Sequence, residues 1–225
     1  MDTDVLRQAP LFSALDDEAA IALRSSLGTF RLRRGEVLFH EGDSGDKLYI
    51  VAEGKVKLGR SSADGRENLL AILGPGQMFG ELSLFDPGPR SATVTAVTDS
   101  SFFSLSHDDL LRWLDGRPDV ANGLLSQLAS RLRRANDVVA DLVFSDVPGR
   151  VAKALLDLAD RFGRTADDGV HVHHDLTQEE LAQLVGASRE TVNKALADFA
   201  SRGWLRLEPR SVVLMDLDRL ARRAR

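Results

Sequence analysis

The feature that most restricts the fold of this chain is a long stretch, residues 119–145, whose apolar side chains repeat at heptad spacing. The repeating positions are Leu125, Leu128, Leu132, Ala135, Val139 and Leu142. A helix of about 27 residues is about 40 Å long, which is more than one small domain can cover. We therefore predict that this seam is the interface of a parallel two-stranded coiled coil in a homodimer. The alternative is that the helix packs on its own domain.

Short strands separated by glycine turns precede this helix. From Arg31 to about Leu105, runs of β-branched and aromatic residues alternate with turns such as EGDSGD and SADGREN. Regularly spaced short strands of this kind indicate a small antiparallel barrel or jelly roll. Residues 11–27 have helical spacing after Pro10, so we also predict one or two short leading helices, with Asp16 or Asp17 as the N-cap.

The residues after 145 have the pattern of a winged helix-turn-helix. Asp146 followed by Pro148 predicts a helix N-terminus after a sharp hinge. A capping box lies at 177–180, and Gly186 stands where a tight turn between two helices needs a positive φ. Two apolar strands around a turn within 204–216 predict the wing. The overall prediction is an α+β fold.

The second helix of this pair has side chains that can read DNA. Arg189 can pair with O6 and N7 of guanine, and Glu190 can accept from N4 of cytosine. The candidate DNA contacts are Thr177, Gln178, Ser188, Arg189, Glu190, Thr191, Asn193 and Lys194. A simpler interpretation is that Glu190 and Lys194 form a surface ion pair. Because a dimer has two such helices, we predict a palindromic operator with major-groove contacts about 34 Å apart.

The loop 79–93 brings together backbone donors, a carboxylate and a guanidinium. Gly80 lets the backbone approach a ligand closely, and Glu81 offers an acceptor for a ribose hydroxyl. Arg90 can pair with a phosphate through its planar fork. This set of groups suits a phosphorylated sugar.

The composition limits which classes of protein this chain can belong to. The chain has 43% hydrophobic and 28% charged residues, as expected for a soluble globular protein. No apolar run approaches the roughly 20 residues of a membrane span, and the N-terminus has no signal-peptide pattern, so we expect a cytoplasmic protein with no membrane partner. With no cysteine, the chain cannot form a disulfide, a thiolate zinc site or an iron–sulfur cluster.

The net charge of -5 is unevenly distributed along the chain. Residues 1–145 hold 16 Lys and Arg against 21 Asp and Glu, whereas residues 146–225 hold 13 against 13. The DNA-binding half is therefore neutral, and its affinity has to come from a localised basic patch.

Three histidines, His171, His173 and His174, are clustered in the sequence. Strand alternation puts only His171 and His173 on one face, and no carboxylate spacing completes a metal site, so we expect no bound metal. A cupin-like metalloenzyme is an alternative of another class. It needs a His/Glu cluster on barrel strands, which His40 and His107 do not supply.

Three stretches, GELSLFDPGPRSA, DLVFSDVPGRVAKALL and DLTQEELAQLVGASRETVNKALADF, resemble the CRP/FNR family of bacterial regulators, in particular its actinobacterial cyclic AMP receptor branch. The resemblance covers essentially the whole chain. It implies a cyclic-nucleotide-binding β-roll with leading helices in residues 1–117 and a dimerisation helix in 118–145. Residues 146–225 would form the winged helix-turn-helix.

The resemblance also implies roles for individual residues. The phosphate-binding cassette of the family falls on Gly80, Glu81, Leu82, Ser83, Arg90 and Ser91. There the glutamate holds the ribose 2′-hydroxyl, and the arginine and serine hold the cyclic phosphate. The enterobacterial relative contacts adenine through Thr and Ser hydroxyls of the dimer helix, where this chain has Ala135 and Asn136. Only Asn136 can donate and accept. Lys194 stands where that relative has arginine.

The function that the resemblance implies is a dimeric regulator of transcription, an activator or a repressor, controlled allosterically by cyclic AMP. It is not an enzyme and has no cofactor apart from that ligand. RNA polymerase contacts are expected, and the candidates are the loop around Asp64 and Glu67 and the loop 163–169. Because Ala135 removes a contact to the base, we predict a weak switch with measurable DNA binding before ligand. A dimeric regulator that responds to no ligand, or to another nucleotide, is the alternative.

Overall fold

The computed structural model describes residues 24, 27–62, 67–86, 88–115 and 118–224. The chain divides into two compact units, one of residues 1–60 with 71–134 and one of residues 61–70 with 135–225. The leading helices predicted within 11–27 lie almost entirely outside the described residues, as does Asp64. None of the helices within the described ranges has the length and apolar character that crossing a membrane requires.

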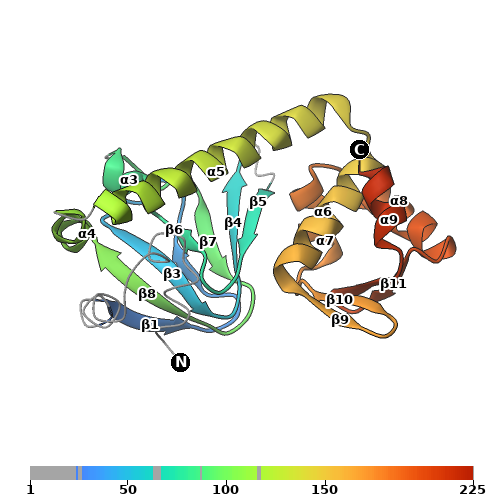
Figure 1. Cartoon of the computed structure of the whole chain (residues 1–225), viewed down its shortest axis with the longest axis horizontal. Coiled ribbons are helices and arrows are strands. Elements are labelled where there is room, and N and C mark those ends of the chain that lie inside the picture. The colour runs from blue at the N-terminus through green and yellow to red at the C-terminus, as the bar shows by residue number, and fades with distance from the viewer. Residues whose placement is uncertain (1–23, 25–26, 63–66, 87, 116–117, 225) are drawn as a thin grey trace. The chain divides into compact units, whose positions relative to one another are not determined.

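Two four-stranded sheets form the β-roll of the first part of the chain (Figure 1). In one sheet the order is β1 (Gly28–Leu32), β8 (Ser100–Ser106), β3 (Lys47–Glu53) and β6 (Met78–Phe79). In the other it is β2 (Val37–Phe39), β7 (Thr93–Ala96), β4 (Val56–Ser61) and β5 (Glu67–Leu73). The pairs β1–β8, β3–β8, β3–β6, β2–β7 and β4–β7 are antiparallel. The predicted barrel or jelly roll is therefore confirmed.

Strand alternation in β3 and β8 gives the first sheet two apolar faces. Val51 and Phe102 join a core cluster that reaches β4 and β7, so this face is turned toward the other sheet. Ile50 and Phe103 point the opposite way and belong to a second cluster. That cluster includes residues of α4 (His107–Leu114) and of the long helix α5 (Pro118–Phe144), so these helices cover the outer face.

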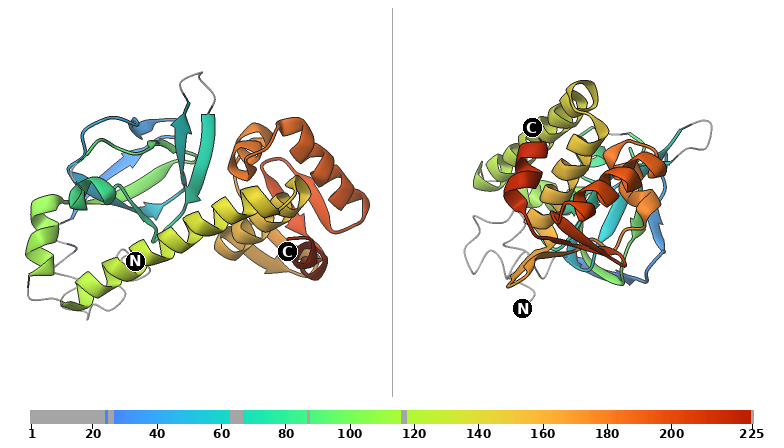
Figure 2. Two further views of the ribbon diagram at one scale, coloured as in Figure 1. Left: turned by 90° about the horizontal axis from the view of Figure 1, so that it is seen from above. Right: turned by 90° about the vertical axis from the view of Figure 1, so that its right-hand side faces the viewer.

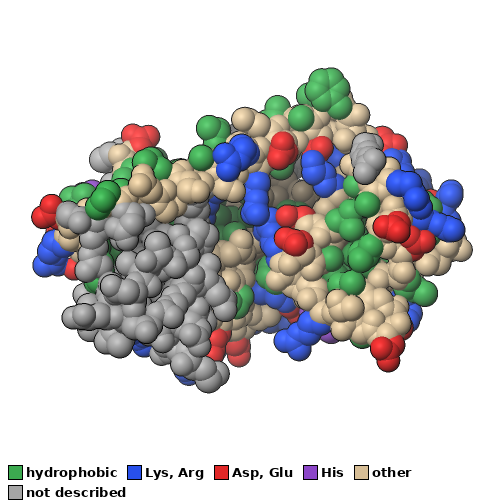
Figure 3. Space-filling model, in the orientation of Figure 1, with side chains coloured by type: hydrophobic (Ala, Val, Ile, Leu, Met, Phe, Trp, Pro, Cys, Tyr) green, Lys and Arg blue, Asp and Glu red, His purple; other side chains and the backbone are tan. Residues whose placement is uncertain are grey.

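Helix α5 is continuous over the stretch predicted to be one helix (Figure 2). Leu124 is buried, and Leu128 packs against the same core cluster of the β-roll. The other large seam residues, Leu125, Leu132, Val139 and Leu142, are exposed, as are Val138, Val143 and Phe144. Apolar side chains accordingly gather along the ridge that α5 forms in Figure 3. Leu128 thus packs on its own domain, and the remaining seam is open to solvent in this chain.

The second unit has a four-stranded antiparallel sheet and the helix pair. The sheet order is β11 (Leu205–Glu208), β12 (Ser211–Leu214), β10 (Gly169–His173) and β9 (Gly163–Ala166). The helices are α6 (Val147–Phe162), α7 (Gln178–Val185), α8 (Arg189–Ser201) and α9 (Leu217–Arg223). The predicted wing is the hairpin β11–β12. Strand β9 and helix α9 were not predicted.

Capping residues determine where the two helices of the pair begin and end. Both hydrogen bonds of the capping box between Thr177 and Glu180 are present at the start of α7. Gly186 ends that helix in the left-handed region at φ 69°, and the Ser188 side chain caps α8. These three features were predicted from the sequence, and each is confirmed.

The predicted helix start is confirmed, because Asp146 caps the first turn of α6, and a hinge at this point stays a prediction. The Asp146 side chain accepts from the Gly149 backbone N–H at 2.9 Å and pairs with Arg223 of α9 at 2.6 Å. The bond from Arg223, followed by that from Gly149, lowers the pKa of Asp146. The end of α5 is bonded to α6 too: Arg150 donates to the carbonyl oxygen of Ser145 at 2.8 Å, and Lys153 pairs with Asp141 at 2.5 Å.

Candidate functional site

The loop after β6 requires glycine at position 80. Gly80 has φ 79°, which side chains rarely adopt. A Cβ there would lie 2.8 Å from Nη1 of Arg90 and 3.1 Å from the carbonyl oxygen of Lys47. The backbone therefore comes close to the guanidinium that the sequence assigned to a phosphate.

Arg90 is buried, with 4% of its surface exposed. Its guanidinium donates to the carbonyl oxygens of Gly80 at 2.8 Å and Lys47 at 3.0 Å. Its Cζ also lies 4.3 Å from the ring centroid of Phe39 and 5.6 Å from that of Tyr49. Burial raises the pKa of Tyr49, and the nearby Arg90 acts against this rise. The result is a buried positive charge held in a fixed position, which attracts an anion.

Glu81 is the second buried charged group, with 1% of its surface exposed. Its Oε1 accepts from Nη1 of Arg131 on α5 at 2.5 Å, and Arg131 also donates to the carbonyl oxygen of Met78. Its Oε2 is buried and accepts no hydrogen bond within the part of the chain that the structure describes. One oxygen is thus held by α5, and the other is available to a hydroxyl.

Sequence reasoning did not find Arg131. The available signal was its position one helical turn before Ala135, because residues four apart on a helix share a face. If the base lies against Ala135, the Arg131 side chain one turn away is expected to reach the same site.

A pocket of about 70 Å³ joins these groups. It is lined by Gly80, Glu81, Arg90, Ser91, Arg131 and the apolar residues Phe39, Leu58, Phe79, Leu82, Ala92 and Val94. Five predicted ligand residues therefore lie together: Gly80, Glu81, Leu82, Arg90 and Ser91. The side chain of Ser83 lies outside the described residues, and Ala135 and Asn136 are exposed on α5. Typical sites for small molecules are about 300–1,000 Å³, so this pocket is smaller than a usual small-molecule site.

The outer face of the helix pair carries the predicted DNA contacts. Arg189, Glu190, Thr191 and Lys194 are exposed on α8, and Val192, Leu196 and Phe199 are buried beneath them. Glu190 and Lys194 form the surface ion pair at 2.7 Å. Arg189 and Asn193 both donate to Gln178 on α7, at 3.4 Å and 3.2 Å. Exposure and polarity are what a major-groove surface needs.

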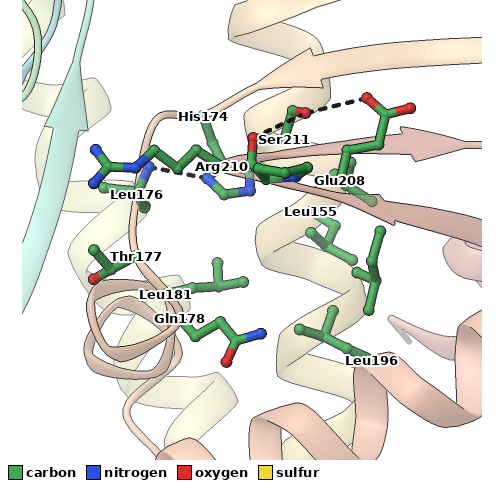
Figure 4. A pocket seen from close by; sticks show the side chains of 13 residues that line it. Leu155, His174, Leu176, Thr177, Gln178, Leu181, Leu196, Glu208, Arg210 and Ser211 are labelled. Atoms are coloured by element: carbon green, nitrogen blue, oxygen red, sulfur yellow. Dashed lines mark hydrogen bonds between the residues drawn. The ribbon is translucent and has the colours of Figure 1, made fainter.

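A second pocket, of about 240 Å³, lies between the start of α7 and the wing (Figure 4). Leu155, Leu181 and Leu196 line it, together with His174, whose Nδ1 accepts from the backbone N–H of Leu176 at 3.1 Å. The charged residues that line it, Glu208 and Arg210, lie at the wing turn, where Glu208 is half-buried and Arg210 is exposed, unlike the buried Glu81 and Arg90.

The clustered histidines have separate surroundings. His174 is buried, and His171 lies on β10 with its Nε2 2.6 Å from Asp168. Asp168 also pairs with Arg206, and the bonds from Arg206 and His171 lower the pKa of Asp168 to about 2. No group of three potential metal ligands occurs within the ranges that the structure describes.

Comparisons with known proteins match both halves of the chain. The model of the cyclic nucleotide-binding domain matches residues 29–117, and that of the Crp-like helix-turn-helix domain matches residues 149–223. A CRP-like cAMP-activated global transcriptional regulator of Mycobacterium tuberculosis is 56% identical over 222 residues, which is 99% of each chain. The cyclic AMP receptor protein of Thermus thermophilus is 39% identical, over 92% of this chain and 93% of its own. The structure of FixK2 from Bradyrhizobium japonicum has a TM-score of 0.78 at 25% identity, covering 87% of this chain and 96% of its own.

We predict that Arg131→Ala destabilises the β-roll, because it leaves the buried Glu81 carboxylate without its cation. Removing one partner of a fully buried pair costs about 3–5 kcal/mol, and the 34% exposure of the Arg131 side chain reduces this to about 1–3 kcal/mol. Urea unfolding at neutral pH measures the loss. The control Arg133→Ala removes an exposed arginine two residues further along α5 and should change little.

The double variant Arg131→Ala/Glu81→Gln removes the buried charge and should recover part of the lost free energy of unfolding. If Arg131→Ala were as stable as Arg133→Ala, the ion pair would contribute nothing to the β-roll.

Proposed function

Because this chain belongs to the CRP/FNR family of transcription regulators, we propose that it is a homodimer that binds cyclic AMP in its β-roll and a palindromic operator through α8. The family consists of DNA-binding regulators and not of enzymes. The observation that carries the proposal is the pair of buried opposite charges, Glu81 and Arg90, that line one pocket in a chain with a helix-turn-helix. The proposed division is a nucleotide-binding domain at 1–117, a dimerisation helix at 118–145 and a DNA-binding domain at 146–225.

The geometry supports distinct roles for the pocket residues. Arg90 turns its fork from the carbonyl oxygens of Gly80 and Lys47 toward the cyclic phosphate, which is a stronger, charged acceptor. Ser91 adds a hydroxyl, and Gly80 lets the backbone come close. Oε2 of Glu81 accepts from the ribose 2′-hydroxyl while its Oε1 stays with Arg131.

The base would lie against α5, beside Ala135 and Asn136. Ala135 offers only a methyl group, so hydrogen bonding to the purine depends on Asn136. A ligand shifts a two-state equilibrium only by its differential affinity, and a change from 1:99 to 99:1 needs about 5.5 kcal/mol. Losing a polar contact at 135 lowers that difference. We therefore propose a switch of partial amplitude, in which the ligand-free dimer already binds DNA.

The dimer is supported by the exposed apolar seam of α5. Leu125, Leu132, Val139 and Leu142 each have more than half of their surface open to solvent. They recur at heptad positions on one helix. Burying apolar surface gains about 25 cal/mol per Å², so a second copy of α5 is the natural cover for this seam.

On DNA, each α8 would enter a major groove, with Arg189 and Glu190 at base edges. Thr177, Ser188, Thr191 and Lys194 are proposed to contact phosphates or neighbouring bases. Because operator DNA lies in the cytoplasm of the bacterial relatives, we propose that the protein acts there. RNA polymerase is a proposed partner, through the turn between β9 and β10 or the loop before β5.

Titration calorimetry tests the nucleotide site. We expect binding heat with cyclic AMP and a loss of affinity of about 100-fold or more for Arg90→Ala, because removing a buried charged partner costs about 2–5 kcal/mol or more. Arg133→Ala is the control, and thermal melts show that each variant is folded. Undiminished binding by Arg90→Ala would refute the phosphate site, and no heat with cyclic AMP or cyclic GMP would refute the sensor.

Sedimentation velocity tests the dimer. The double variant Leu132→Glu/Val139→Glu places charges in the seam and should shift the wild-type dimer to monomer. Asp137→Lys changes a charge on the opposite side of α5 and should leave the dimer intact. A wild-type chain that sediments as a monomer at micromolar concentration would rule out the coiled-coil interface.

A further inference from the structure

The Gln178 side chain joins the two helices of the DNA-binding pair and also lines the pocket of Figure 4. Gln178 is the first residue of α7, directly after the N-cap Thr177. Its Oε1 accepts from Nη2 of Arg189 at 3.4 Å and from Nδ2 of Asn193 at 3.2 Å, and both of these residues lie on α8. In Figure 4 the Gln178 amide extends from α7 toward Leu196 of α8. A single acceptor thus holds two side chains that are one turn apart on the helix that faces DNA.

The hydrogen-bonding chemistry fixes the orientation of all three groups. Arginine has only donors, so the Gln178 atom that faces Arg189 must be the carbonyl oxygen. The Asn193 atom that faces the same oxygen must then be its NH₂ group. Oδ1 of Asn193 is left buried, with no donor within hydrogen-bonding distance in the described part of the chain. A buried acceptor cannot reach a base edge, so Asn193 is directed toward Gln178 and away from the groove.

The charged residues next to Arg189 on α8 do not compete with Gln178 for its guanidinium. Glu190 is the carboxylate next to Arg189 in the sequence, and it is paired with Lys194 on the next turn at 2.7 Å. Within the described part of the chain, Arg189 is therefore oriented by a neutral amide and not by an ion pair. A neutral partner holds the guanidinium more weakly than a carboxylate does, so Arg189 can still bind a guanine. The length of its bond to Gln178 is consistent with this.

We propose that Gln178 is a positioning residue that determines base specificity by holding Arg189 ready for a G·C pair, with Asn193 as the support of Gln178. This inference rests on the proposed function, because it requires that α8 reads DNA. It differs from the usual role of a residue at a helix N-terminus on DNA, which is to contact a phosphate. A phosphate contact strengthens binding to every sequence equally, whereas a positioned arginine favours one base pair.

The expected size of the effect follows from side-chain entropy. Immobilising a flexible side chain on binding costs about 0.5–1.5 kcal/mol, and a side chain held beforehand avoids part of this cost. Releasing Arg189 from Gln178 should therefore lower discrimination by about 2- to 10-fold.

The test measures specificity and not affinity alone. A palindromic duplex is selected from random DNA by the wild-type protein with cyclic AMP, and each G·C pair of its half-sites is changed to A·T in turn. Fluorescence anisotropy at two salt concentrations then compares wild type with Gln178→Ala, Asn193→Ala, Arg189→Ala and the double variant Gln178→Ala/Arg189→Ala. Gln183→Ala is the matched control, because this glutamine lies on the same helix and forms no hydrogen bond with α8 among the described residues.

We expect Gln178→Ala to reduce discrimination at the G·C pair that Arg189→Ala identifies, and to have no further effect in the double variant. Asn193→Ala should cause a smaller loss at the same pair, and Gln183→Ala none. All variants should melt like the wild type. An equal loss on every duplex with a shallower salt dependence would overturn the proposal in favour of a phosphate contact. The proposal would also be overturned if Gln178→Ala had a further effect in the variant that lacks Arg189. A gain in discrimination by Gln178→Ala would overturn it as well.

Failure of the proposed function gives a different result. If Arg189→Ala bound all duplexes as the wild type does, α8 would not read bases through Arg189, and the inference about Gln178 would fail with it. If only the Gln178 variant behaved like wild type, DNA reading by α8 would stand and the positioning role would be wrong.

Discussion

Burying a carboxylate is costly unless a positive group and hydrogen bonds replace the lost water, and in this β-roll the carboxylate is that of Glu81. Its partner, Arg131, belongs not to the roll but to α5. The same arginine binds the carbonyl oxygen of Met78 in β6, so the helix is tied to the loop that forms the pocket. Whatever occupies the pocket and bonds to Glu81 therefore acts on a group that is already connected to α5.

Successive residues of α5 contact the β-roll, the pocket and the solvent. Leu124 and Leu128 pack on the roll and Arg131 reaches the pocket, while the exposed seam runs along the helix from Leu125 to Leu142. The helix then ends at Phe144, and α6 begins from a cap that Arg223 and Gly149 hold in place. The junction of the two helices is bonded as well, because Lys153 of α6 pairs with Asp141 of α5 at 2.5 Å. In the helix pair, Gln178 of α7 bonds to Arg189 and Asn193 of α8.

Sequence patterns predicted those parts of the structure that depend on near neighbours. The capping box at Thr177, the left-handed turn at Gly186 and the wing each involve residues a few positions apart, so spacing alone determined them. The pair of Glu81 and Arg131 is 50 residues apart in the chain, and the bonds of Gln178 cross between two helices. Such contacts depend on how elements pack, which periodicity does not encode. Helix α9 was missed because LDRLARR is short and has few apolar residues, and its place is set by packing on α6 and by the Asp146–Arg223 pair.

The most direct test of this account is the gain in operator affinity that cyclic AMP produces in the wild type and in Arg131→Ala, measured by fluorescence anisotropy under conditions in which both are folded and dimeric. Arg133→Ala serves as the control. We expect Arg131→Ala still to bind the nucleotide through Arg90, but with a ligand-induced gain well below that of wild type and control. An undiminished gain in Arg131→Ala would show that the pair of Glu81 and Arg131 does not connect the pocket to α5.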